Sequence, residues 1–152
     1  MVINFGQIVL FLDENLLHFN RQQNLSLLNI NKRYNMKFSV DKQEGVVVYE
    51  LLEEKLTSLN APVLKSELVL ANTEGFKNIV VDLGKVKFVD SSGLSAILIG
   101  HRLCKDEKGI FALCGLNDAI KGLIKISQLE EVLHTYSTQS DALEAINKKK
   151  KK

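Results

Sequence analysis

The stretch Asn78-Ile79-Val80-Val81-Asp82-Leu83 decides the fold, because an apolar run flanked by polar residues is typical of a strand that is covered on both faces. Residues 85–89 lead from this run to the turn Asp90-Ser91-Ser92-Gly93-Leu94. A stretch with helical periodicity follows, and Lys108-Gly109 ends it. The centre of the chain therefore predicts a buried strand, a polar turn and a helix, in that order.

The residues before this strand predict an antiparallel start. Residues 37–40 and 46–51 have the pattern of two strands, and Gly45 between them can take the positive φ that many hairpin turns need. Residues 60–72 then predict a helix, in which Pro62 is tolerated because it falls in the first turn.

The residues after the central helix continue the alternation of strands and helices. We expect strands at 110–114 and 132–136, and helices at 117–126 and 141–146, the last one capped by Ser140. An opening hairpin followed by alternating helices and strands predicts the α/β class, with a mixed, mostly parallel sheet and about four helices. In such sheets ligands and switches gather beyond the carboxyl ends of the strands, where the turn at residues 90–94 falls.

This turn places two hydroxyls and a carboxylate at a predicted helix N-terminus. The first amide N–H groups of a helix lack intrahelical partners and carry roughly half a positive charge, so they can accept an anion or a phosphorylated side chain. A serine there would make a covalent switch. The alternative is that Asp90 or Ser91 simply caps the helix.

Gly93 also has two explanations. Glycine in a first helical turn costs up to about 1 kcal/mol relative to alanine, so its presence needs a reason. Either the missing β-carbon lets a partner protein approach the serine, or Gly93 packs closely against a neighbouring strand.

Composition and charge predict one domain that, without its terminal lysines, carries no net positive charge. The chain has 152 residues, of which 45% are hydrophobic, enough for one substantial core. Its formal charge of +2 comes from the lysines at 148–152, without which 15 basic residues face 18 acidic ones. We interpret this run as a solvated, disordered tail and expect neither a nucleic-acid nor a membrane partner.

Residues 1–35 differ from the rest, being rich in Asn and Leu without clear strand or turn signals. We expect them to be an N-terminal extension that folding does not need, disordered or translated from an early start codon, with a domain at 36–147. The apolar residues 5–12 lack a basic leader and are too short for a membrane span. The two cysteines, Cys104 and Cys114, do not form a framework of disulfide bonds, which favours the reducing cytoplasm.

No catalytic constellation is visible. Ser91 and Ser92 lack the G-x-S-x-G context of hydrolases, and no motif ties His18, His101 or His134 to them. His101 falls on the apolar side of its helix, which favours a core or boundary position. Because phosphate-loop motifs and metal-ligand spacings are also missing, we expect no catalytic residue, no metal and no cofactor.

The chain resembles the STAS domain family, and within it the bacterial anti-sigma-factor antagonists, from Met36 to about Ile146. The resemblance rests on the strand at 79–83, on Phe88-Val89-Asp90-Ser91-Ser92-Gly93-Leu94, and on the segment 119–129. It implies that Ser91 is the phosphoacceptor, with Asp90, Ser92, Gly93 and Leu94 forming the partner-binding surface.

The resemblance also implies a mechanism. The unphosphorylated antagonist would bind an anti-sigma factor that is also a serine kinase, phosphorylation of Ser91 would end that interaction, and a serine phosphatase would reverse it. The alternative is an accessory STAS subunit, for instance of a lipid-transport complex, in which Ser91 is never modified.

Overall fold

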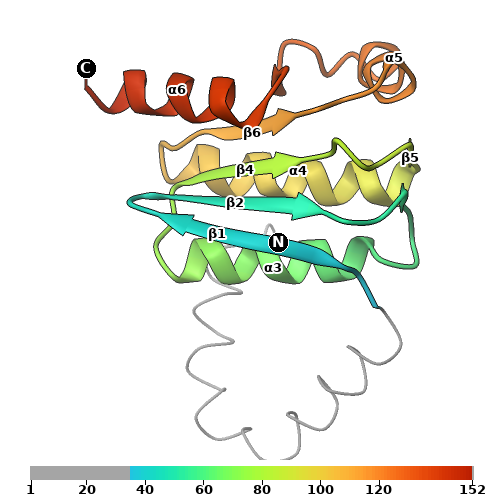
Figure 1. Cartoon of the computed structure of the whole chain (residues 1–152), viewed down its shortest axis with the longest axis horizontal. Coiled ribbons are helices and arrows are strands. Elements are labelled where there is room, and N and C mark those ends of the chain that lie inside the picture. The colour runs from blue at the N-terminus through green and yellow to red at the C-terminus, as the bar shows by residue number, and fades with distance from the viewer. Residues whose placement is uncertain (1–34, 152) are drawn as a thin grey trace, which may run out of the picture. The chain divides into compact units, whose positions relative to one another are not determined.

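The computed structural model describes residues 35–151, so the expectation for the N-terminal extension falls almost entirely outside the described residues and the boundary at residue 35 stays a prediction. Within this range the chain forms seven strands and four helices (Figure 1). They are, in chain order, β1 (Phe38–Gln43), β2 (Val46–Leu51), β3 (Lys55–Leu56), α3 (Ala61–Thr73), β4 (Asn78–Asp82), β5 (Phe88–Val89), α4 (Ser91–Asp106), β6 (Phe111–Cys114), α5 (Asp118–Ile126), β7 (His134–Tyr136) and α6 (Gln139–Lys150).

The main sheet has five strands in the order β1-β2-β4-β6-β7. β1 and β2 form an antiparallel hairpin whose turn contains Gly45 at a φ of 72°, as its position between the two strands predicts. The other neighbours are parallel, and the carboxyl ends of β2, β4 and β6 point to the same side of the molecule (Figure 1). The predicted mixed α/β architecture is therefore confirmed.

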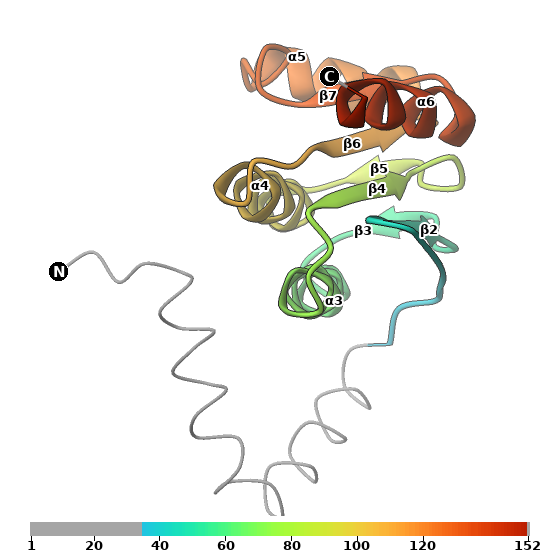
Figure 2. The same ribbon diagram turned by 90° about the vertical axis from the view of Figure 1, so that its left-hand side faces the viewer.

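Both faces of the central strands are covered, as the apolar runs in the sequence require. On one face, residues of β2, β4 and β6 form a core cluster with Ala142 and Ile146 of α6. On the other, the Tyr49 hydroxyl donates a hydrogen bond of 3.0 Å to the Glu67 carbonyl in α3, and α4 packs beside α3 (Figure 2). Because side chains alternate along a strand, each central strand contributes to both cores.

A second, two-stranded parallel sheet lies beside the main one. It pairs Lys55 with Phe88 and Leu56 with Val89, so β3 is fixed against β5 just before α4 begins. The sequence pattern does not predict β3, because two residues are too few to show a period. This small sheet positions the start of α4.

The final helix differs from the prediction. α6 begins at Gln139 instead of residue 141, and its N-cap is Thr138, whose hydroxyl accepts a hydrogen bond from the Asp141 amide at 3.2 Å. Ser140 lies inside the helix, so its expected capping role is wrong. The helix continues through Lys150, which corrects the interpretation of the lysine run as a disordered tail for the described residues 148–150.

Candidate functional site

Ser91 is the first residue of α4, and its side chain is exposed. The chain reaches it from β5, on the side of the molecule to which β2, β4 and β6 direct their carboxyl ends (Figure 1). The predicted location of the turn beyond these strand ends is therefore confirmed.

Asp90 is the N-cap of α4 and holds two segments together. Its Oδ1 accepts a hydrogen bond of 2.9 Å from the Gly93 amide, and its Oδ2 accepts one of 3.1 Å from the Ser58 amide in the loop after β3. The predicted capping role of Asp90 is thus confirmed. Because the carboxylate supplies the cap, the Ser91 hydroxyl has no capping function and is left at the free end of the helix.

Gly93 is buried, and close packing explains it. A β-carbon there would lie 2.5 Å from the Leu56 carbonyl oxygen and 2.9 Å from the nearest side-chain carbons of Leu56 and Val89. The hypothesis that the missing β-carbon admits a partner is therefore unnecessary, and Gly93 does not lie on an exposed surface with Ser91. Its contribution to the site is to let α4 approach β3 and β5.

Two exposed apolar side chains flank the serine turn. Leu59, which follows Ser58, is 75% exposed, and Phe88, two residues before Asp90, is 52% exposed. Ser92 and Leu94 are half-buried on the first turn of α4. The sequence analysis missed Leu59, because only the hydrogen bond between Asp90 and Ser58 reveals that its loop reaches the site.

The charge at this end of α4 has two opposing sources. The first turn itself contains no acidic side chain, but the carboxylate of the N-cap Asp90 accepts the Gly93 amide and offsets part of the positive charge of the helix N-terminus. Just before the two strands of the small sheet, Lys87 donates a hydrogen bond of 2.9 Å to Glu54, which lowers the pKa of that carboxyl. This pair is exposed, so it contributes little to stability.

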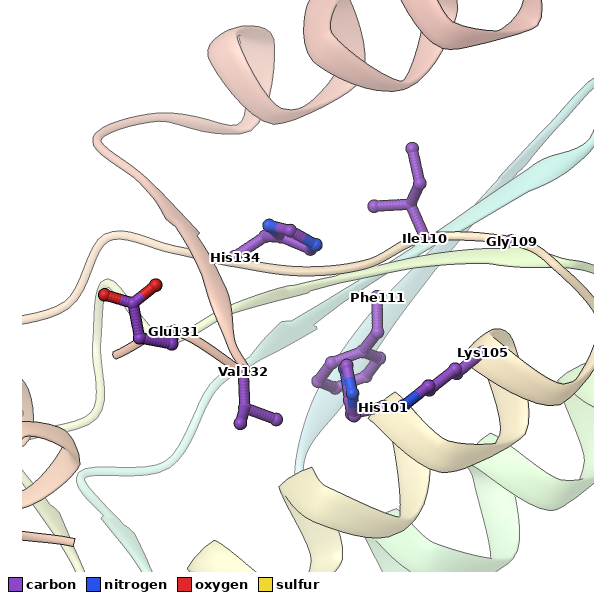
Figure 3. A pocket seen from close by; sticks show the side chains of 8 residues that line it. All are labelled: His101, Lys105, Gly109, Ile110, Phe111, Glu131, Val132 and His134. Atoms are coloured by element: carbon purple, nitrogen blue, oxygen red, sulfur yellow. The ribbon is translucent and has the colours of Figure 1, made fainter. Parts of the chain in front are cut away.

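A separate cavity of about 310 Å³ contains His101 and His134 (Figure 3). Burial, together with the positive charge of Lys105 and the neighbouring His134, lowers the pKa of His101. The residues that line the cavity include no hydroxyl or thiol nucleophile, and Ser91 is not among them. The structure therefore does not combine these histidines with Ser91 in a hydrolytic site, while His18 lies outside the described residues.

Residues 35–151 also lack a cluster of three or more His, Cys, Asp or Glu side chains with the arrangement of a metal site. None of the helices in that range has both the length and the apolar character that a membrane crossing requires.

Comparisons with known proteins agree with this architecture. A model of the STAS domain family matches residues 37–142. The chain is 29% identical over 92 residues to BtrV of Bordetella bronchiseptica, a candidate anti-sigma factor antagonist, covering 60% of this chain and 78% of that protein. It is 26% identical over 110 residues to the anti-sigma F factor antagonist of Paenibacillus polymyxa, covering 72% and 93%.

Solved structures show the same similarity. The crystal structure of a candidate anti-sigma factor antagonist from Thermotoga maritima superimposes with a TM-score of 0.66 at 25% sequence identity. The match covers 72% of this chain and 94% of that one.

Proposed function

The chain belongs to the STAS domain family, and from this premise we propose that it is a cytoplasmic anti-sigma-factor antagonist that works as a phosphorylation-controlled partner switch. In this proposal the protein is a regulator and catalyses no reaction. Its partners are an anti-sigma factor with serine kinase activity and a serine phosphatase, and Ser91 is the phosphoacceptor.

The observation that carries the proposal is the exposed Ser91 hydroxyl at the N-terminus of α4. Asp90 supplies the cap, so the serine is free to react without loss of the helix end. A phosphate at this position carries about −1.5 to −2 charges at pH 7. The helix N-terminus favours such a group by about 0.3–1 kcal/mol, and the neighbouring Asp90 carboxylate opposes it.

The surroundings of Ser91 support binding of a protein partner. Leu59 and Phe88 present apolar surface on the loop that Asp90 holds and on the strand that leads to Ser91. Removal of such side chains from water is the main source of free energy in association. In our proposal the surface of the partner closes over the neutral hydroxyl of unphosphorylated Ser91. Phosphorylation would then bury an unpaired dianion at a cost of several kcal/mol, enough to weaken the complex about a hundredfold or more.

The test is phosphorylation by a cognate anti-sigma factor kinase and ATP, read by intact-protein mass and peptide mapping. We expect one phosphate on Ser91, none on the Ser91→Ala variant, and unchanged modification of Ser92→Ala, which keeps the acceptor and removes its neighbour. Ser91→Ala should bind the kinase constitutively, and Ser91→Asp should bind weakly.

The accessory-subunit hypothesis makes the opposite prediction. If Ser91 carries no phosphate in cells that contain the active kinase, and Ser91→Asp binds its partner as tightly as Ser91→Ala, the switch is wrong. Co-purification with transporter components would then support the accessory role.

A further inference from the structure

A hollow of about 570 Å³ lies at the amino-terminal ends of β4 and β6, away from Ser91. It is lined by Lys77, Lys108, Lys149 and Lys150, and its lining includes no acidic side chain. In Figure 1 the end of α6 and the turn between β1 and β2 lie on the left, whereas β5 and the start of α4 lie on the right. The two sites are therefore at opposite ends of the sheet.

The lysines come from three separate segments that the fold brings together. Lys77 precedes β4, Lys108 lies in the turn between α4 and β6, and Lys149 and Lys150 belong to the last turn of α6. Lys150 donates a hydrogen bond of 2.7 Å to the Glu44 carbonyl oxygen, which fixes the end of α6 against the hairpin turn. None of the four forms an ion pair with an acidic residue of the chain between residues 35 and 151.

Helix geometry divides the lysine run between two faces. Lys149 and Lys150 line the hollow, whereas Lys148 forms an ion pair of 3.0 Å with Glu144 on another face of α6. The negative end of a helix dipole favours lysines in the last turn, which accounts for the residues of α6. It does not account for Lys77 and Lys108, which belong to other segments.

We propose that this hollow is a binding site for a small ligand with two or more phosphate groups. Four lysines line one hollow whose lining includes no acidic side chain, so the positive potential there favours a multivalent anion. The volume is in the range of small-molecule sites, and Ile110 and Ile146 add an apolar part to its lining. A phosphate-loop motif is one continuous stretch of sequence, whereas the lysines of this hollow come from three segments, so the sequence need not contain such a motif. The proposal is independent of the role proposed for Ser91.

Calorimetric titration of the full chain with inorganic tripolyphosphate tests the proposal. We expect saturable binding with one site, weakened about tenfold in Lys108→Gln and in Lys149→Gln, because each removes one charge-assisted contact. Lys148→Gln is the control, because it removes the same charge one residue away, on the face of α6 where Lys148 pairs with Glu144. It should alter the affinity for tripolyphosphate less than about twofold. Amide resonances of Gly45, Gly75 and Gly109, which line the hollow, should shift during the titration.

Four outcomes would overturn the proposal. Failure of the unmodified chain to bind tripolyphosphate excludes the site. Equal losses in Lys148→Gln and Lys149→Gln would indicate non-specific attraction to the lysine run. Binding to vesicles that contain an anionic phospholipid, without binding to tripolyphosphate, would indicate a membrane-facing surface instead. Orthophosphate binding as tight as tripolyphosphate would reduce the site to a single-anion site and also contradict the proposal.

Discussion

The carboxylate of Asp90 joins two segments that are far apart in sequence, because its Oδ2 accepts the amide hydrogen bond of Ser58 at 3.1 Å while its Oδ1 caps α4 through Gly93. The start of α4 and the loop that carries Leu59 are thereby held in one arrangement. The exposed Ser91 and the exposed Leu59 consequently lie on segments that are fixed to each other.

Removal of this carboxylate should loosen the site. We expect Asp90→Ala to lower the free energy of unfolding by about 1–2 kcal/mol, since a helix loses its cap and the Ser58 amide loses its acceptor. Asp90→Asn retains one acceptor oxygen and should lose less. Urea denaturation of the three proteins measures the difference, and an unchanged midpoint in Asp90→Ala would contradict the role assigned to the carboxylate.

Two glycines on helices provide a matched pair. Gly93→Ala places a β-carbon 2.5 Å from the Leu56 carbonyl oxygen, so α4 must move away from β3, and we expect a loss of about 1–3 kcal/mol. A β-carbon at Gly122 in α5 would have no neighbouring atom within 4 Å, so Gly122→Ala should stabilise the fold by about 0.5–1 kcal/mol. Thermal unfolding of both variants would refute the packing explanation if Gly93→Ala proved neutral.

The two cysteines should be unreactive in the folded protein. Burial raises the pKa of both Cys104 and Cys114 to about 12, so almost no thiolate exists at about pH 8. We expect a disulfide reagent such as dithiobis-nitrobenzoate to modify them at the rate of unfolding, and immediately in denaturant. Fast modification of the native chain would show that one of these side chains is accessible.

His101 should make stability depend on pH in the mildly acidic range. Burial favours the neutral ring, so the pKa in the folded chain lies below the ordinary value of about 6.5. Protonation therefore favours the unfolded chain, and stability should fall as the pH decreases through about 6.5 towards the lower pKa of the folded state. Lys105, His134 and Glu131 line the same cavity and face His101 there. The variant His101→Gln should lose less stability between about pH 7 and pH 5 than the unchanged chain, as urea denaturation at each pH would measure.

Sequence periodicity predicted the elements that are long enough to show it. The buried run at 79–83 differs from β4 by one residue at each end, and 46–51 agrees with β2. β3 has only two residues, and its place depends on β5 across more than thirty positions of sequence. No local pattern contains that information.

The site was predictable in part for the same reason. Asp90 as a cap and Ser91 at a helix start follow from residue preferences within one turn. The burial of Gly93 and the exposure of Leu59 beside the serine depend on how β3 packs against α4, so they required the structure. The helical lysines at 148–150 were missed because a run of one charged residue shows no periodicity, although Glu144 and Lys148 have the spacing of a helical ion pair.

The switch proposed for Ser91 should act at the surface and leave the fold unchanged. Ser91 is exposed at a helix N-terminus, where the helix charge favours a negative group and the neighbouring Asp90 carboxylate opposes it, so Ser91→Asp should change the free energy of unfolding by no more than about 0.5 kcal/mol. Ala96→Asp, further along the same helix, places a charge at a position that is 0% exposed and should cost about 3 kcal/mol or more. Urea denaturation of both variants separates the two effects. If Ser91→Asp were as destabilising as Ala96→Asp, phosphorylation would act by unfolding α4, and charge at the partner surface would no longer explain the switch.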